Sequence, residues 1–155
     1  MKVQGSQIIP GTAEQVYDLL LDPAVLAACM PGCQELVRVE DGIYKMKMKL
    51  AIPALTGDFS GTVRISEAVR PVAFQMTIDG AGRLGHVKGE GRVRLTGVDD
   101  STTVHYEGDV QVGGTIAAVG QRLIDTTSKM MIRNFFSNLA RVKQSVEREH
   151  NLGSR

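Results

Sequence analysis

Apolar and polar residues alternate along most of the chain between residues 34 and 112. In one run, Tyr44, Met46, Met48, Leu50 and Ile52 alternate with Lys45, Lys47 and Lys49. Turn sequences separate the runs at Asp41-Gly42, Arg70-Pro71, Gly80-Ala81-Gly82 and Asp99-Asp100. With further strands expected at 2–9 and 34–40, the pattern predicts about seven strands, which are antiparallel because the turns are short. One face of this sheet is apolar and the other is solvated.

A different period begins after Gly113-Gly114, where apolar residues recur in steps of three and four. The stripe consists of Ile116, Val119, Leu123, Thr127, Met130, Met131, Phe135, Leu139, Val142 and Val146. This spacing predicts one amphipathic helix over residues 115–149, with no proline to interrupt it. A helix of that length is about 50 Å long, and we expect it to lie along the apolar face of the sheet.

Two short helices are expected between the first strand and the second. Thr12 and Gln15 have the spacing of a capping box, which predicts a helix from there to Asp22-Pro23. A second helix is expected over residues 24–29, ending before Pro31-Gly32. The predicted fold class is therefore α+β: a curved antiparallel sheet of about seven strands wrapped around a long C-terminal helix, with two short helices after the first strand.

Length and charge favour a single cytoplasmic domain. The chain has 155 residues and a formal net charge of +1, so we expect one domain over residues 1–150, with 151–155 a tail or a cloning remnant. The small net charge and the 5% aromatic content argue against nucleic-acid binding. Two cysteines fit a reducing compartment, and neither an apolar leader nor an apolar run of the ~20 residues that span a membrane is visible.

Several glycines fall on the apolar face of the predicted sheet, where a packed core would have larger side chains. They are Gly61, Gly85, Gly89, Gly91 and Gly108. One interpretation is that they let the sheet bend around the helix, and another is that they leave a cavity for a small apolar molecule. Both can hold together, and the flexible methionines expected on the same face favour the cavity. The residues expected to line it are Leu20, Leu26, Pro31, Tyr44, Met46, Met48, Leu50, Phe59, Gly61, Phe74, Met76, Val87, Gly89, Gly91, Tyr106, Gly108, Leu123, Thr127, Met130, Met131 and Phe135.

Residues that could carry catalysis or bind a metal are sparse. Cys29 and Cys33 do not have the C-x-x-C spacing of redox proteins, and no second ligand pair accompanies them, so a structural role is favoured. Residues 80–85 match G-x-G-x-x-G, but this segment is predicted to join two antiparallel strands, which a dinucleotide site does not do. We therefore predict no catalytic residues and no bound metal.

The segment Asp22-Pro23, followed by Cys29-Met30-Pro31-Gly32-Cys33, resembles a signature of the carbon monoxide dehydrogenase G-subunit family. That family belongs to the SRPBCC superfamily, whose helix-grip fold is shared with START lipid-transfer domains. Residues 57–63, 106–114, 120–125 and 134–136 also resemble segments of the family, so the resemblance covers nearly the whole chain. It implies an accessory protein of a molybdenum-containing carbon monoxide dehydrogenase or a related hydroxylase, held at the cytoplasmic face of the membrane. Several members have a C-terminal extension for that contact, and residues 151–155 are too few to form one.

Three functions are compatible with these observations. The first is a non-enzymatic carrier of an apolar electron carrier, such as menaquinone or ubiquinone or another isoprenoid, whose head group is expected near Tyr44, Tyr106 or Pro31-Gly32. The second is a cyclase or dehydratase, as found elsewhere in the superfamily, although only tyrosines are expected as titratable groups in the cavity. The third is a scaffold that binds only the dehydrogenase. For the carrier, a leucine at Gly91 or Gly108 is expected to block ligand uptake while the protein stays folded.

Overall fold

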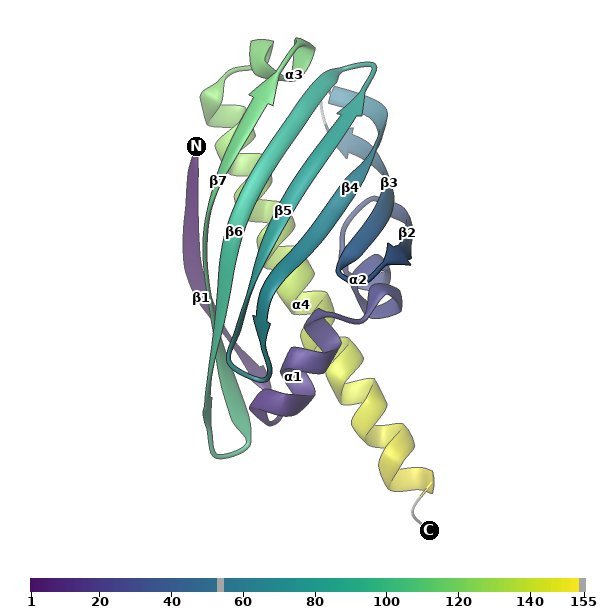
Figure 1. The fold of residues 1–155 in the computed structure, drawn as a ribbon, viewed down its shortest axis with the longest axis vertical. Coiled ribbons are helices and arrows are strands. Elements are labelled where there is room, and N and C mark those ends of the chain that lie inside the picture. Colours follow the sequence, from purple (N-terminus) through teal and green to yellow (C-terminus); the bar gives the residue numbers. More distant parts are fainter. Residues whose placement is uncertain (53–54, 154–155) are drawn as a thin grey trace.

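The computed structural model of the protein describes residues 1–52 and 55–153, with side chains over 1–51 and 56–145. Its elements are β1 (Lys2–Pro10), α1 (Ala13–Leu20), α2 (Pro23–Cys29), β2 (Cys33–Glu40), β3 (Ile43–Ile52), β4 (Leu55–Val69), β5 (Ala73–Gly82), β6 (Gly85–Val98), β7 (Ser101–Gly113), α3 (Thr115–Ala118) and α4 (Gln121–Gly153). The strands form one antiparallel sheet in the order β1-β7-β6-β5-β4-β3-β2. Figure 1 shows α4 crossing one face of the curved sheet, with α1 and α2 toward one end and α3 at the other. The predicted fold class is confirmed.

The starts of the two short helices follow from their capping residues. Thr12 Oγ1 accepts a hydrogen bond from the Gln15 backbone at 3.2 Å, and Gln15 Oε1 accepts one from the Thr12 backbone at 3.0 Å. This is the predicted capping box. Asp22 Oδ1 accepts from the backbone of Ala24 at 2.9 Å, and Pro23 occupies the first turn. Because proline suits that position, α2 starts one residue earlier than predicted.

Two predicted boundaries are wrong. The C-terminal helix is not continuous, because Gly120 has a φ of +99° and separates the short α3 from α4. Glycine adopts this left-handed conformation without the steric cost that other residues incur. The segment Gly80-Ala81-Gly82 is not a turn but the end of β5, where Gly80 pairs with Gly61 on one side and with Val87 on the other. The strand therefore presents one more inward glycine than was predicted.

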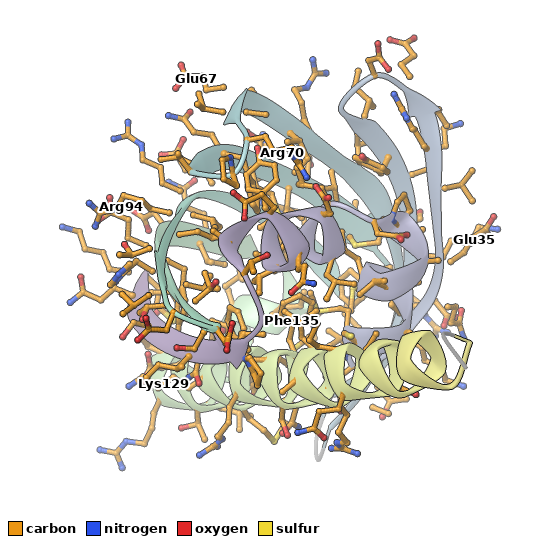
Figure 2. All side chains as sticks on the ribbon, turned by 90° about the horizontal axis from the view of Figure 1, so that it is seen from below. Glu35, Glu67, Arg70, Arg94, Lys129 and Phe135 are labelled. Carbon is orange, nitrogen blue, oxygen red and sulfur yellow. The ribbon has the colours of Figure 1, made fainter. Side chains whose placement is uncertain are left out.

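Most of the buried apolar residues form two clusters toward opposite ends of the sheet; Tyr44 and Val63 are buried as well but belong to neither. The α1–α2 cluster contains Ile9, Val16, Tyr17, Leu20, Cys29, Phe74, Leu95, Val104, Phe135, Phe136 and Leu139. The α3 cluster is built on Phe59 and Ile116, with Met48, Leu50, Leu84, Val87, Val112 and Val119 packed against them. In Figure 2 the curved sheet and α4 enclose the interior, and Phe135 lies on the inner side of α4.

Helix α1 is fastened to the turn between β4 and β5. The hydroxyl of Tyr17 donates a hydrogen bond to the Ala73 carbonyl at 3.1 Å, and the Tyr17 ring packs edge-on against Phe74. Arg70 donates to both carboxylate oxygens of Asp18, at 2.8 and 2.9 Å. This arrangement closes one end of the interior with a helix instead of a loop.

Candidate functional site

The two clusters are separated by an interval of the sheet that contains the buried Tyr44 and Val63 on β3 and β4 and mainly glycines on β6 and β7. On β6, Val87 belongs to the α3 cluster and Val93 to the α1–α2 cluster, and the inward residues between them are glycines 89 and 91. On β7 the same interval holds Gly108 and Val110. We call the half-buried residues of this interval the central segment; on the sheet they are Met76, Ile78, Gly89, Gly91, Gly108 and Val110, and on α4 they are Leu123, Thr127 and Met131. None of these residues belongs to the α1–α2 cluster or to the α3 cluster, as the described side chains define them.

At two inward glycines an added Cβ would make only ordinary van der Waals contacts. A Cβ placed on Gly89 would lie 3.7 Å from the carbonyl oxygen of Asp109, which is an ordinary van der Waals distance. A Cβ on Gly80 would have a single neighbour within 4 Å, the Ser60 carbonyl oxygen at 3.8 Å. Gly80 pairs with Val87 two positions from the Gly89 pair, so both glycines belong to one region of β5 and β6. Gly80 was missed in the sequence because its glycine-rich surroundings were interpreted as a turn, although it continues the alternation of β5.

Other inward glycines allow close approach of the backbones. A Cβ on Gly61 would collide with the carbonyl oxygen of Asp79, and one on Gly108 would lie 2.5 Å from that of Glu90. A Cβ on Gly91 would lie 3.3 Å from a backbone oxygen of β7, which is tight. At Gly61 and Gly108 the bending interpretation therefore holds. The expectation that the fold tolerates leucine at Gly108 is corrected, because a strand would have to move.

The predicted lining residues are distributed over three environments. Leu20, Leu26, Phe74 and Phe135 pack in the α1–α2 cluster, and Met48, Leu50, Phe59 and Val87 pack in the α3 cluster. Tyr44 is buried, and Pro31, Met46, Gly61, Met76, Gly89, Gly91, Tyr106, Gly108, Leu123, Thr127 and Met131 are half-buried. Met130 does not line the interior, since 38% of its surface is exposed. Each residue turns a helix by roughly 100°, so Met130 is rotated away from the inner face that Met131 shares with Thr127 and Phe135.

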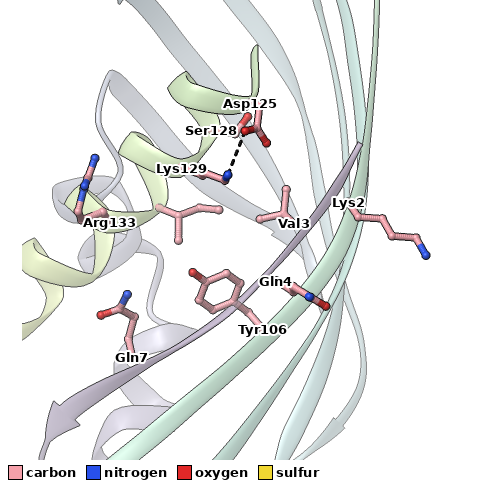
Figure 3. A pocket seen from close by; sticks show the side chains of 10 residues that line it. Lys2, Val3, Gln4, Gln7, Tyr106, Asp125, Ser128, Lys129 and Arg133 are labelled. Atoms are coloured by element: carbon pink, nitrogen blue, oxygen red, sulfur yellow. Dashed lines mark ion pairs between the residues drawn. The ribbon is translucent and has the colours of Figure 1, made fainter. Parts of the chain in front are cut away.

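A pocket of about 380 Å³ lies between β1 and the first half of α4 (Figure 3). We call it the β1–α4 pocket; its lining residues are Lys2, Val3, Gln4, Gln7, Tyr106, Asp125, Ser128, Lys129, Ile132 and Arg133. Tyr106 is the one predicted site residue among them. The other residues were missed because they are mostly polar. A signal was present in Gln7, which occupies an inward position of β1 between Gly5 and the buried Ile9.

The cysteines lie where α2 meets β2. Cys29 is fully buried, and its carbonyl accepts a hydrogen bond from the side chain of Asn138 in α4 at 3.0 Å. Burial raises the pKa of the Cys29 thiol, and burial likewise raises the pKa of Cys33. Both thiols therefore remain protonated at neutral pH, which makes them weak nucleophiles and poor metal ligands. Among the described residues, no three His, Cys, Asp or Glu side chains gather as a metal site would require.

No described helix combines the length and apolar character that crossing a bilayer would require. Helix α4 is long, but apart from Met130 its exposed side chains over residues 121–145 are polar or charged.

Comparison with solved structures places the fold. A conserved protein from Geobacillus kaustophilus is 30% identical, with a TM-score of 0.88 over 91% of this chain and 93% of that one. A START superfamily protein from Mycobacterium smegmatis is 17% identical, with a TM-score of 0.68 over 92% and 97% of the two chains. The Zhui aromatase/cyclase from Streptomyces sp. R1128 is 11% identical, with a TM-score of 0.67 over 90% and 91%. These similarities show the helix-grip fold of START-like proteins, as predicted.

Sequence comparison identifies the family. No curated protein sequence matches the chain significantly. The profile of the CoxG family, described as the G subunit of carbon monoxide dehydrogenase, matches residues 5–143. That match includes most of β1, the other strands, the three shorter helices and α4 up to Lys143. The chain therefore belongs to the carbon monoxide dehydrogenase G-subunit (CoxG) family.

Proposed function

We propose that this protein is a non-enzymatic accessory protein of a molybdenum-containing carbon monoxide dehydrogenase-type oxidoreductase, and that it binds an apolar ligand at the central segment. Family membership supports the association with such an enzyme. The observation that carries the ligand is the separation of the two apolar clusters on β6, with Gly89 between them, where an added Cβ would make only ordinary van der Waals contacts. Protein interiors are otherwise packed as densely as organic crystals.

The ligand class that fits best is an isoprenoid quinone, such as menaquinone or ubiquinone. The central segment offers aliphatic side chains, thioethers and glycines, which suit a flexible isoprenoid tail. A tail in this position would restore dispersion contacts that an empty interior lacks, and it would gain about 25 cal/mol per Å² of buried apolar surface. In this role the protein would bring the electron carrier to the enzyme and link the enzyme to the cytoplasmic face of the membrane.

The proposed role is binding and not catalysis. Acid–base catalysis needs a titratable side chain within hydrogen-bond reach of the reacting group. The residues that define the central segment are aliphatic residues, methionines, glycines and one threonine. A cyclase-type reaction would require groups that these residues do not supply.

Transfer of menaquinone from liposomes tests the proposal. Purified protein is incubated with menaquinone-loaded liposomes, separated by flotation and examined by native mass spectrometry for a bound isoprenoid mass. We expect the wild type to extract menaquinone and Gly89→Leu to fail, because the leucine would occupy the tail's position. Lys88→Leu is the matched control, since it adds the same side chain one residue away on the outer face of β6. Failure of the wild type to extract menaquinone, or equal extraction by Gly89→Leu, would contradict the proposal.

A further inference from the structure

We propose that the β1–α4 pocket binds the oxygen-bearing head group of an amphipathic ligand, and that the Tyr106 hydroxyl donates the hydrogen bond that holds it. This inference rests on the proposed function, because the tail of the same ligand would occupy the central segment. It adds the position of the head group and its chemistry, a carbonyl or a carboxylate.

The ring of Tyr106 is fixed by packing, while its hydroxyl is available to a ligand. Its ring stacks on Phe136 of α4, with centroids 5.5 Å apart and planes inclined by 21°. The hydroxyl lines the β1–α4 pocket and has no hydrogen-bond partner within the described part of the chain. A phenol that is fixed by stacking and aimed into a pocket is ready to donate to an oxygen acceptor, with little rotational freedom left to lose on binding.

The absence of a side chain at Gly5 leaves room for the Tyr106 hydroxyl beside the pocket. Gly5 of β1 pairs directly with Tyr106 of β7. A Cβ on Gly5 would lie 2.5 Å from the Tyr106 hydroxyl oxygen and 2.8 Å from the carbon that carries it. The backbone of Gly5 is extended, so an alanine there would not strain the chain; it would displace the hydroxyl. A glycine at position 5 therefore allows the Tyr106 hydroxyl to occupy its present position over β1.

The other polar groups of the pocket are mainly donors. Gln7 lies on the same inward face of β1, and Ser128 and Lys129 approach from α4 (Figure 3). The Lys129 ammonium is 3.0 Å from the Asp125 carboxylate, which engages one of its three protons. A head group that only accepts hydrogen bonds matches this set of donors. Asp125 offsets the charge of Lys129, while Lys2 and Arg133 leave the lining positive, so a carboxylate can bind there as well as a neutral carbonyl.

A row of small residues connects the pocket with the central segment. Val3, which lines the pocket, pairs with Gly108 of β7, and Gly108 pairs with Gly91 of β6. The next residue across the sheet is Met76 of β5. Gly108 and Gly91 have no side chains to project from the inner face of the sheet. A tail that starts at the pocket can therefore pass over them toward Gly89. The pocket and the central segment thereby fit the two ends of one amphipathic molecule.

Three probes separate head-group recognition from tail binding. Decylubiquinone presents neutral carbonyls, dodecanoate presents a carboxylate, and dodecylamine presents an ammonium that only donates hydrogen bonds. Dissociation constants are measured by isothermal titration calorimetry for the wild type and for Tyr106→Phe, which retains the stacked ring. We expect Tyr106→Phe to weaken decylubiquinone or dodecanoate binding roughly ten-fold, as the loss of one hydrogen bond implies, and to leave dodecylamine unchanged. The probe that loses more affinity identifies the head-group chemistry.

Two further variants fix the position of the head group. Gly5→Ala should reproduce the effect of Tyr106→Phe, and the double variant should bind no more weakly than Tyr106→Phe alone, because both changes remove the same contact. Tyr44→Phe removes a second inward tyrosine hydroxyl, which lies across the sheet on β3 and is expected to have no part in head-group binding. A loss in Tyr44→Phe, or no loss in Tyr106→Phe, would overturn the proposal while tail binding could still stand. If no probe binds the wild type and no menaquinone is extracted, the proposed function fails as well.

Discussion

Replacing Gly89 by leucine should make the ligand-free protein more stable, which is unusual for a substitution in a protein interior. The nearest atoms to a Cβ at this position are the Asp109 carbonyl oxygen at 3.7 Å and Val110 Cγ2 at 3.8 Å. Neither contact requires the backbone to move. The remaining atoms of the leucine would extend toward the interior of the central segment, whose residues belong to neither apolar cluster.

The size of the effect follows from two gains and one loss. Burying a leucine side chain contributes about 1.5–3 kcal/mol, and removing a glycine from a strand contributes about 0.5–1 kcal/mol. Fixing the leucine rotamer costs about 0.5–1 kcal/mol. The free energy of unfolding should therefore rise by about 2 kcal/mol, which corresponds to an increase in Tm of about 4–8 °C for a domain of this size.

The measurement is urea or thermal unfolding of delipidated protein, followed by circular dichroism. If packed side chains already fill the space beside Gly89, the leucine would instead cost about 1–3 kcal/mol through overpacking, and Tm would fall. The sign of the change thus decides between the two interpretations. Lys88→Leu should leave Tm nearly unchanged, because its side chain projects to the outer face. A fall in Tm for Gly89→Leu alone would refute the reasoning.

Three other expectations can be checked with single experiments. Arg70 lowers the pKa of the Asp18 carboxyl, so their pair stabilises the fold above the unfolded pKa of about 3.9 and this contribution disappears as the pH falls through the lower folded value. Both side chains are more than half exposed, so Asp18→Asn should cost at most about 1 kcal/mol in urea unfolding at neutral pH and nothing near pH 2; an equal cost at both pH values would contradict this. Gly120→Ala should lower the free energy of unfolding by about 1–3 kcal/mol through its positive φ, and no change would show that α3 and α4 tolerate another junction. Changing Cys29 and Cys33 together to alanine should leave menaquinone extraction intact, whereas its loss would assign the thiols a part in binding.

The strands were predictable because one face of the sheet is buried and the other is exposed, so apolar and polar residues alternate along each strand. The alternation of Tyr44, Met46 and Met48 with lysines predicts the face that is buried, and the structure confirms it. The capping box of Thr12 and Gln15 was also readable, because its interactions join residues three apart. Interactions between residues close in sequence can be predicted from the sequence itself.

The features that escaped prediction depend on atoms distant in sequence. An added Cβ on Gly108 would collide with the backbone of β6, whereas one on Gly89 would make ordinary contacts, and only the distances between neighbouring strands distinguish these two glycines of the same face. The β1–α4 pocket is lined by residues from the first strand and the last helix, such as Gln7 and Lys129. All the other strands lie between them in the sequence, so no rule based on residue spacing could have paired them. The break at Gly120 was missed because a single glycine in an otherwise regular apolar stripe is compatible with a continuous helix.

The fold separates the residues that hold it together from those proposed to bind the ligand. One end is fixed by the α1–α2 cluster, where Leu139 is fully buried and Asn138 ties α4 to α2. The other end is fixed by Ile116 and Phe59, which bring α3 against the sheet. Because α4 is held at its middle and the preceding α3 is held against the sheet, the helix keeps its place without requiring every inward residue between these points to be large. That arrangement is compatible with glycines on the inner face of the sheet and with the ligand proposed for the central segment.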